Sequence, residues 1–355
     1  MKNPSVSVIV PIFNAEKHLD DLFDSIRQQK KQFDEIILVD NNSTDKSYEK
    51  CVIFKEKNPS LNIKVLKETK KGPSAARNKG IKNSSTDLIC FIDADCVIDK
   101  NYAENALKIS LKENIYDVFG GIADNKEIRP KTLTEEFANY YWTLSRKKDS
   151  AIPMNNITDI FAPRHSFITT FNMVARKKVF EKTKGFDENL FYSEDIDFWA
   201  RCCLNGFKSL AGIPELVVAH KNRVTFRSMV KQYFKYTESF AFIVKKYFPK
   251  KLIITRNDIK IFKLERITGI IEINPHTISI AFLFLIFVFP ASYYILFSFL
   301  FIMGMRFFSV RKFLKQYNIS LKKIILFSML MEAKQIAVTI GAFRGMIKQK
   351  IIYLK

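Results

Sequence analysis

The chain of 355 residues is long enough for one large or two ordinary domains. Its composition, with 47% hydrophobic and 26% charged residues, predicts a folded protein and excludes a disordered one. The formal net charge of +21 is unevenly placed, because residues 221–355 hold 24 basic and 5 acidic residues and therefore +19 of it. These basic residues surround an uncharged apolar segment at 277–305, so we expect them to face anionic lipid and not nucleic acid.

The first hundred residues alternate short apolar runs with amphipathic stretches. Four apolar runs predict strands and the three stretches between them predict helices, at 6–10, 16–30, 35–39, 45–57, 63–66, 74–81 and 88–92. This alternation predicts an α/β domain whose mostly parallel sheet is covered by helices on both faces. In such sheets ligands bind at the carboxyl ends of the strands.

Beyond the first hundred residues the pattern is less regular. Residues 120–165 have no clear period and contain three prolines, which is typical of a functional loop or lid. The apolar run 216–219 predicts a strand that ends at His220. Residues 225–248 predict a basic amphipathic helix.

The uncharged segment 277–305 suits a membrane better than water. As one helix it would extend ~43 Å, too long for a ~30 Å hydrocarbon core, and Pro290 divides it into halves too short to cross alone. Basic residues on both sides favour a hairpin with both ends on the cytoplasmic side over a single span. The alternative is a buried core hairpin beneath a solvated basic surface. The amphipathic stretch 324–347 is then expected to lie on the membrane surface.

Two carboxylates, Asp93 and Asp95, follow the apolar run 88–92. At a strand end, where the chain turns, carboxylates two residues apart can share one divalent cation, and such hard oxygen ligands suit Mg²⁺ or Mn²⁺. Two acids in a surface turn are also common without a metal. The pair gains weight here because further motifs accompany it in a fixed order.

These motifs resemble family 2 of the inverting glycosyltransferases, which have the nucleotide-binding GT-A fold, and the resemblance covers about residues 4–222. In chain order the motifs are VSVIVPIFN at 6–14, VDNNSTD at 39–45, GPSAARNKG at 72–80, DAD at 93–95, GFDE at 185–188 and EDIDFWAR at 194–201. One departure is Asn41, where the family often has a second aspartate. Asp40 remains, so the resemblance implies a nucleotide-sugar donor, with a UDP-sugar favoured.

The resemblance also implies roles for individual residues. It implies a donor pocket formed by Pro11, Phe13, Asn14, Asp40, Gly72, Arg77, Asn78 and Asp93. It implies that Asp95, together with His220, holds the metal ion on the donor diphosphate. A metal there has a physical function, because charge develops on the leaving diphosphate as the glycosidic bond breaks.

Inversion requires a base that takes the acceptor's hydroxyl proton, and Asp195 matches the family's base. Crowding with Glu194 and Asp197 is expected to raise at least one carboxyl pKa. A structural alternative is that these acids serve the following helix, predicted at 197–205. The residues expected to contact the acceptor or support the base are Glu194, Asp197, Trp199 and Arg201.

The expected organisation is a GT-A domain at 1–222, a basic amphipathic helical linker at 223–275, and a membrane hairpin with amphipathic helices at 276–355. We expect a metal-dependent glycosyltransferase at the cytoplasmic face of the membrane, acting on a lipid-linked or saccharide acceptor in cell-envelope polysaccharide or glycolipid synthesis. One alternative is a sugar-phosphate nucleotidyltransferase, which would need a glycine-rich loop where residues 11–14 stand. Another is a non-catalytic, membrane-tethered sugar-nucleotide-binding protein, against which the intact acids at 93, 95 and 195 argue.

Overall fold

The computed structural model divides into two compact units, residues 1–130 with 138–222 and residues 131–137 with 223–355. The predicted hairpin at 277–305 lies outside the described residues, so it stays a prediction. The structure describes residues 4–125, 130–145, 151–157, 168–221, 225–248, 252–256, 259–264, 269–272 and 320–349.

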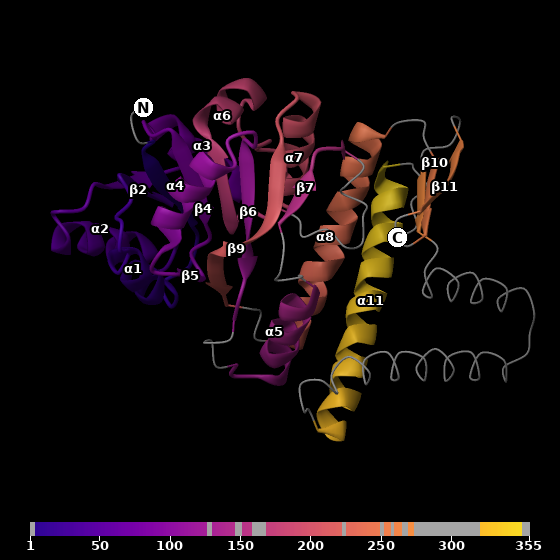
Figure 1. The fold of residues 1–355 in the computed structure, drawn as a ribbon. Helices are drawn as coiled ribbons and strands as arrows, with labels where there is room; N and C mark the ends of the chain where they lie inside the picture. The colour runs from indigo at the N-terminus through magenta and orange to yellow at the C-terminus, as the bar shows by residue number, and fades with distance from the viewer. Residues whose placement is uncertain are drawn as a thin grey trace, which may run out of the picture. The chain divides into compact units, whose positions relative to one another are not determined.

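The first unit is an α/β structure built on one nine-stranded sheet (Figure 1). Its strands are β1 Val6–Ile12, β2 Glu35–Asp40, β3 Ile63–Lys67, β4 Leu88–Ile92, β5 Cys96–Ile98, β6 Val118–Ala123, β7 Ile152–Met154, β8 Asn172–Arg176 and β9 Ser209–His220. Its helices are α1 Leu19–Arg27, α2 Ser47–Lys57, α3 Pro73–Asn83, α4 Tyr102–Lys112, α6 Lys177–Thr183 and α7 Glu194–Leu204, while α5 Leu133–Ser145 begins in the second unit.

The strand order is β3-β2-β1-β4-β8-β6-β9-β5, with β7 paired to β9. The strands β3, β2, β1 and β4 are parallel to one another, as the alternating sequence predicts. Beyond β4 the sheet becomes mixed, because β8 runs antiparallel between β4 and β6. The described pairs are four parallel and four antiparallel, so the prediction of a mostly parallel sheet is wrong for this second half.

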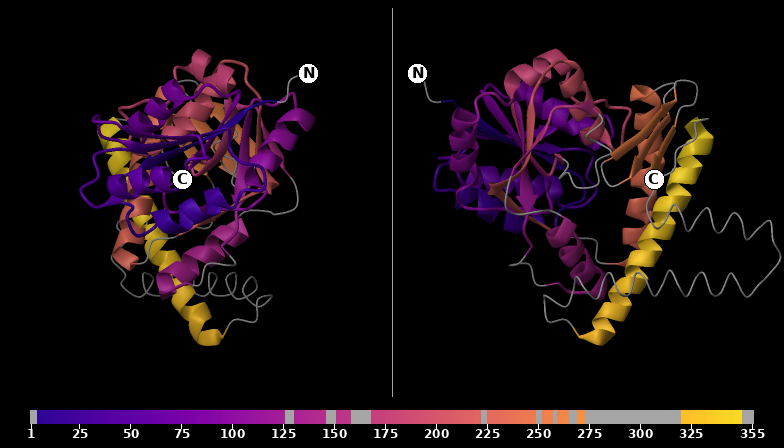
Figure 2. Two further views of the ribbon diagram at one scale, coloured as in Figure 1. Left: turned by 90° about the vertical axis from the view of Figure 1, so that its left-hand side faces the viewer. Right: turned by 45° about the vertical axis from the view of Figure 1, so that its right-hand side comes forward.

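Helices pack on both faces of this sheet (Figure 2). Val8 of β1 points into a buried apolar cluster that also contains side chains of α1, α2 and α4. Its neighbour Ile9 points to the opposite face, where α3 approaches so closely that a Cβ on Gly80 would lie 2.4 Å from the Ile9 Cγ2 atom. On that face Phe91 of β4 packs edge-on against Phe180 of α6. The β1 and β4 strands are therefore buried on both sides, which explains their continuous apolar sequence.

The stretch 120–165 is more structured than its sequence suggests. It contains the end of β6, the helix α5 and the strand β7, so the expectation of one long irregular loop is wrong for its described part. The β6 strand was hard to recognise because Gly120 and Gly121 weaken the strand pattern, and β7 is only three residues long. Residues 158–167 lie outside the described residues.

The second unit contains two long helices, α8 Phe226–Tyr247 and α11 Leu321–Gln349, and a three-stranded sheet. The sheet consists of β10 Leu252–Arg256, β11 Ile259–Leu264 and β12 Gly269–Glu272. The sequence predicted a helical linker over 223–275, and this is wrong for the three strands at 252–256, 259–264 and 269–272. The strands β10, β11 and β12 are four to six residues long and rich in isoleucine, phenylalanine and threonine, residue types that favour strands.

Candidate active site

The predicted metal ligands meet at the edge of the sheet where β4 and β9 end. Asp95 lies in the turn between β4 and β5, and Cys96 of β5 pairs in register with His220 at the end of β9. This pairing brings the Asp95 Oδ1 atom to 3.5 Å from the His220 Nε2 atom. The side-chain amide of Asn125 bonds both the backbone N–H and the carbonyl of His220, at 2.8 Å each, and thereby fixes the end of the strand.

The donors gathered here fit a hard divalent cation. Asp95 offers a carboxylate oxygen and His220 a ring nitrogen, and both side chains are partly exposed. The Cys96 thiol is also within reach, since the candidate ligand atoms of the three residues lie within 4.8 Å of one another. Burial, followed by the charge of Asp95, raises the pKa of Cys96 well above its usual value, so this thiol stays protonated. An oxygen and nitrogen donor set favours Mg²⁺ or Mn²⁺ over a thiolate-bound metal.

Arg77 of α3 connects the two halves of the site. Its guanidinium is almost fully buried and donates to the Asp93 Oδ1 atom at 2.8 Å and to the Glu194 Oε1 atom at 2.9 Å. Asp93 follows β4, whereas Glu194 begins α7, so one cation links the DAD turn to the helix that carries Asp195. The sequence predicted Arg77 near the nucleoside, but its link to Glu194 was missed, because the two residues are 117 positions apart.

Asp195 lies in the first turn of α7, directly after Ser193 and Glu194. Ser193 adopts a left-handed backbone with a φ of 62°, which turns the chain sharply into the helix. The Asp195 carboxylate accepts a hydrogen bond from the Ile196 N–H at 2.8 Å. Burial, followed by the negative charge of Glu194, raises the pKa of Asp195 to about 7. The sequence argument expected crowded carboxyls to raise a pKa here, and burial is the larger cause.

The next residues of α7 hold the helix and the loop before it in place. Asp197 is fully buried and accepts a hydrogen bond from the Arg201 Nε atom at 2.8 Å. The Arg201 Nη1 atom donates to the carbonyls of Thr183 and Gly185, both at 2.6 Å. Trp199 is buried in the same helix. Asp197 and Arg201 therefore make supporting contacts in the structure, and their predicted contact with an acceptor stays a prediction.

Asn78 of α3 fixes the loop that leads into α7. Its Oδ1 atom accepts from the Phe186 N–H at 2.8 Å, and its Nδ2 atom donates to the Phe186 carbonyl at 2.9 Å and to Glu188 at 2.8 Å. Both amide hydrogens are thus engaged within the protein. The structure gives Asn78 a positioning role, where the sequence predicted contact with the donor.

The predicted nucleoside pocket lies at the carboxyl ends of β1 and β2. Pro11 is the last residue but one of β1 and is half-buried, and Phe13, just beyond the strand, is 63% exposed and offers an aromatic face. Asn14 has a positive φ of 49°, and its Oδ1 atom accepts from the Thr44 N–H at 2.7 Å. Asp40 is buried, and its Oδ1 atom has no hydrogen-bond partner in the described part of the chain. A buried acceptor of this kind favours a ligand that donates a hydrogen bond.

Asn41, which departs from the family pattern, holds the other wall of this pocket. Its Oδ1 atom accepts from the Gly72 N–H at 2.8 Å, and its Nδ2 atom donates to the carbonyls of Glu68 and Lys70 at 2.9 and 2.7 Å. An aspartate would lack the two donated bonds, which explains why an amide suits this position. Gly72 has a φ of 127°, and a Cβ there would lie 3.3 Å from the ring of Phe191. A glycine is therefore required at position 72 by the backbone conformation and by this ring.

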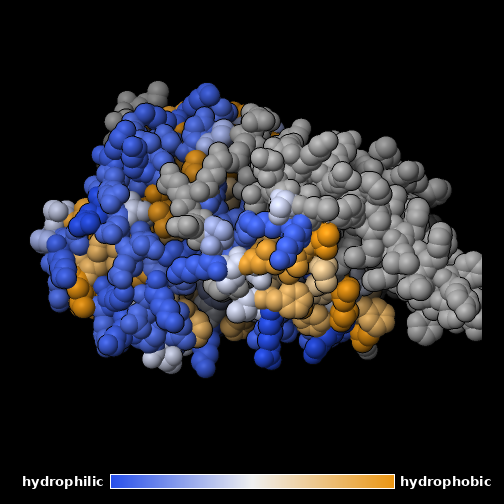
Figure 3. Space-filling model, turned by 90° about the horizontal axis from the view of Figure 1, so that it is seen from below, coloured by the Kyte–Doolittle hydropathy of each residue, from blue (hydrophilic) through white to orange (hydrophobic). Residues whose placement is uncertain are grey.

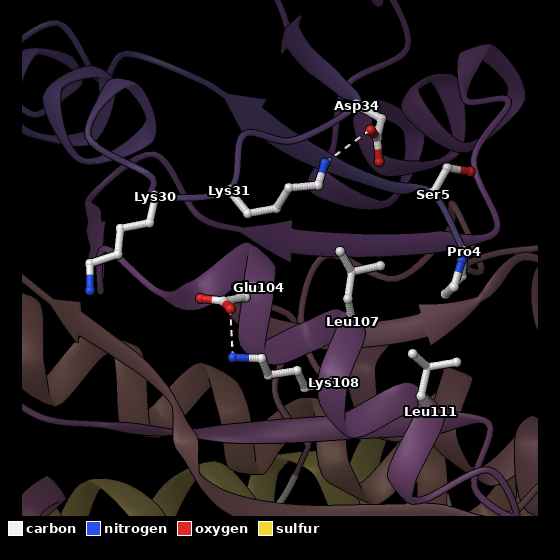
Figure 4. A pocket seen from close by; sticks show the side chains of 9 residues that line it. All are labelled: Pro4, Ser5, Lys30, Lys31, Asp34, Glu104, Leu107, Lys108 and Leu111. Atoms are coloured by element: carbon white, nitrogen blue, oxygen red, sulfur yellow. Dashed lines mark hydrogen bonds and ion pairs between the residues drawn. The ribbon is translucent and has the colours of Figure 1, made fainter. Parts of the chain in front are cut away.

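A separate pocket of about 700 Å³ lies at the opposite, amino-terminal edge of the strands (Figure 4). It is lined by residues that precede β1 and β2 and by one side of α4. Two of its lysines are paired with acids of the same pocket, Lys31 with Asp34 at 3.1 Å and Lys108 with Glu104 at 2.5 Å. None of the predicted site residues lines it, so the candidate active site remains the one at the carboxyl ends of the strands.

Comparisons with known proteins identify the family of the chain. The family model described as glycosyl transferase family 2 matches residues 7–184, which is half of the chain. The minor teichoic acid biosynthesis protein GgaA of Bacillus subtilis is 32% identical over 205 residues, or 56% of this chain and 43% of that protein. A Methanococcus voltae enzyme, dolichyl N-acetyl-alpha-D-glucosaminyl phosphate 3-beta-D-2,3-diacetamido-2,3-dideoxy-beta-D-glucuronosyltransferase, is 22% identical over 250 residues, or 68% of this chain and 74% of that enzyme.

Among solved structures, the mannosyltransferase PcManGT of Pyrobaculum calidifontis superposes with a TM-score of 0.54 at 15% identity. The match covers 99% of this chain and 88% of that one, and it supports the fold. The chain therefore belongs to glycosyl transferase family 2. It is a glycosyltransferase with a GT-A-like α/β domain, and the sugar-phosphate nucleotidyltransferase alternative is wrong. The chain spans less than half the length of GgaA, so the activity of that whole protein is not transferred to it.

Proposed function

We propose that this chain transfers a sugar from a nucleoside-diphosphate sugar to a hydroxyl group of an acceptor, with inversion at the anomeric carbon. The observation that carries the proposal is the network that joins Asp93, the first residue of the DAD motif, through Arg77 to Glu194 in the first turn of α7. This network holds Asp195, the proposed base, at a fixed place relative to the donor side. Its pKa of about 7 allows Asp195 to accept a proton at neutral pH.

Inversion follows from one displacement step. The ionised Asp195 takes the proton of the acceptor hydroxyl while the hydroxyl oxygen bonds to the anomeric carbon. The bond from that carbon to the diphosphate oxygen breaks on the opposite face, and its electron pair leaves with the nucleoside diphosphate. Arg77 holds Asp93 and Glu194 throughout and keeps the carboxylates from separating by mutual repulsion.

Asp95 and His220 are the residues that would hold a Mg²⁺ or Mn²⁺ ion, with their donor atoms 3.5 Å apart. The ion would neutralise charge on the departing diphosphate. On the nucleoside side, Phe13 would stack on the base, and the free Asp40 oxygen would accept a hydrogen bond from the base or the ribose. The resemblance to family 2 favours uridine as that nucleoside.

We infer further that the acceptor is lipid-linked or a saccharide, and that the product belongs to cell-envelope polysaccharide or glycolipid synthesis. The relatives support this, since one is named for teichoic acid biosynthesis and the name of another contains a dolichyl phosphate acceptor. The charge of +19 in residues 221–355 supports attachment to the cytoplasmic face of the membrane through residues 276–355. Apart from the strands β10 to β12, we propose the organisation expected from the sequence: a GT-A domain at 1–222, a basic linker at 223–275 and a membrane-associated region at 276–355.

The proposed activity is tested by incubating the full-length protein with a panel of nucleotide sugars, Mg²⁺ or Mn²⁺, and a lipid extract of bacterial membranes. The expected result is release of nucleoside diphosphate from one donor, preferably a UDP-sugar, and transfer of its sugar to the lipid fraction. Asp195→Asn serves as the matched control, because it keeps the size of the side chain and removes the base. Equal release by the wild type and this variant, or no release with any donor, would contradict the proposal.

A further inference from the structure

The α11 helix, Leu321–Gln349, has two opposite faces with different surroundings. Among the described residues, its stretch Ile325–Gln349 is long and apolar enough to cross a membrane by length and composition. Only 38% of its most apolar window is buried in the structure, so burial in a core does not account for all of its apolar surface. The question is whether α11 crosses a membrane or lies along its surface.

One face of α11 is packed against α8, and the two helices run in the same direction. A Cβ on Gly341 would lie 2.3 Å from the Phe234 carbonyl oxygen, and a Cβ on Gly345 would lie 2.6 Å from the Glu238 carbonyl oxygen. The two glycines therefore allow the backbones to come into close contact. Gly341 and Gly345 are four positions apart on α11, and Phe234 and Glu238 are four positions apart on α8, so the close contact continues over a full helical turn.

An ion-pair cluster fixes this packed face. Glu238 of α8 is buried and pairs with Lys235 at 2.9 Å, Arg344 at 3.2 Å and Lys348 at 2.6 Å. Burial favours its neutral form, but hydrogen bonds from Lys348 and Lys235 prevail and lower the pKa of Glu238. The carboxylate is thus ionised between the helices and holds them together.

The opposite face of α11 carries a row of exposed apolar side chains. At 100° per residue these side chains fall within an arc of about 60°, on the side away from the two glycines. Their exposed fractions are 47 to 63%. The members of this row, which we call the α11 stripe, are Ile325, Met329, Ile336, Ile340, Phe343 and Ile347.

Cations accompany the stripe at both of its ends. Lys322 and Lys323 precede it and are exposed, and Arg344 and Lys348 lie near its other end and are more than half exposed. The face of the molecule on which α11 begins shows apolar side chains gathered beside hydrophilic ones (Figure 3). An apolar row between cations is complementary to a bilayer surface that contains anionic lipid.

The helix α8 excludes a transverse orientation of α11. Because the two helices are parallel and in contact, an α11 that crossed the bilayer would take α8 with it. The described α8 carries charged residues along its length, including Lys231, Lys235 and Glu238, and these are costly inside hydrocarbon. The same charges are readily solvated if α8 lies on the water side.

We propose that α11 lies flat on an anionic bilayer, with the α11 stripe at the boundary between headgroups and acyl chains and α8 on the water side. This placement rests on the membrane attachment proposed above and defines the surface that makes it. It also keeps the catalytic unit at the interface, where a lipid-linked acceptor presents its hydroxyl group.

The test measures the depth of single tryptophans placed along the stripe in the full-length protein. Ile325→Trp, Ile336→Trp and Ile347→Trp are bound to vesicles of phosphatidylglycerol and phosphatidylcholine that carry bromine at shallow or deep acyl positions. The signal of the parent protein, which contains two tryptophans, is subtracted. A flat helix predicts that shallow bromines quench all three positions equally. A crossing helix predicts that deep bromines quench position 336 most and the two end positions least.

A second measurement tests the stripe by flotation with the same vesicles. The double variant Ile336→Asp with Phe343→Asp should bind at least about tenfold more weakly than the wild type. The matched control is Leu111→Asp with Leu204→Asp, which also replaces two exposed apolar residues but lies in the first unit, and it should bind like the wild type.

The outcomes separate the two proposals. Absence of vesicle binding by the full-length protein would refute membrane attachment itself. Binding with a deep position 336, or unchanged binding of the stripe double variant, would refute the flat α11 and leave attachment to residues 277–305. Loss of a dimer in the double variant, seen by light scattering without vesicles, would show that the stripe binds a second copy of the chain.

Discussion

The pH profile of turnover is the sharpest test of the proposed base. Burial and the charge of Glu194 raise the pKa of Asp195 to about 7. Only the ionised form can accept a proton, so kcat/KM should rise with pH, from about one tenth of its plateau at pH 6 to about nine tenths at pH 8. The assay is nucleoside diphosphate release at low donor concentration, measured in buffers across this range.

The variant Glu194→Gln tests whether the rise of kcat/KM with pH comes from the ionisation of Asp195. Glu194→Gln removes the negative charge beside Asp195 and leaves Arg77 with one carboxylate fewer to neutralise. Both changes lower the pKa of Asp195, so the midpoint of the rise should move to lower pH by on the order of one pH unit. The control is Glu188→Gln, an acid of the preceding loop that bonds Asn78 and is not among the groups that shift the pKa of Asp195.

Two results would refute this reasoning. A kcat/KM that is constant between pH 6 and pH 8 would show that no group with a pKa near 7 controls proton transfer. A midpoint that Glu194→Gln and Glu188→Gln move equally would show that the shift comes from general surface charge. In either case another residue would have to be the base.

Four further outcomes are expected. Asp95→Ala should lose metal-dependent turnover and retain its fold, which metal titration and circular dichroism would show, and near-normal turnover would remove Asp95 from the site. Asp195→Asn should bind donor normally and not transfer. The raised pKa of Asp195 makes the stability of the wild type fall as pH rises from about 4 to about 7. Calorimetry should therefore show the variant to be more stable than the wild type at pH 8, by up to about 4 kcal/mol, and equally stable at pH 4. Arg77→Met should lower the free energy of unfolding by about 3–5 kcal/mol, since it leaves buried carboxylates unpaired, whereas Arg27→Met breaks an exposed pair and should cost less than about 1 kcal/mol in the same denaturation experiment. The full-length protein should remain with membranes in ~1 M salt and require detergent for release, and extraction by salt alone would disprove apolar insertion.

The first half of the fold could be predicted because its strands are buried on both faces. β1, β2 and β4 are continuous apolar runs, and each is followed by a polar turn at the carboxyl edge where Asp40 and Asp93 lie. β6 could not be predicted in this way, because two of its six residues are glycines. β10 to β12 were not predicted, because each is a short run of four to six residues within the basic stretch 223–275.

The candidate site shows the same limit at the level of side chains. Motif order and spacing predicted Asp93, Asp95 and Asp195 as site residues, because these residues stand at or next to the ends of elements. It could not show that Arg77 links two of the motifs, because that contact depends on α3 and α7 packing on the same face of the sheet. Nor could it show that Asn41 binds the loop that ends at Gly72, since that loop is 31 residues away.

The negative charges gathered at the carboxyl edge of the sheet explain why donor binding would need a bound cation as well as the residues of the site. Asp93, Asp95 and Glu194 converge on the carboxyl edge, and Arg77 is the cation that ion-pairs with two of them among the described residues. A fourth carboxylate charge is added whenever Asp195 ionises to act as a base, and the donor diphosphate adds more. This excess of negative charge opposes donor binding unless a cation enters with the donor. Asp95 is not one of the two carboxylates that Arg77 pairs with, and together with His220 it is where such a cation would be held. The same electrostatic argument that raises the pKa of Asp195 therefore also supports a metal-dependent reaction.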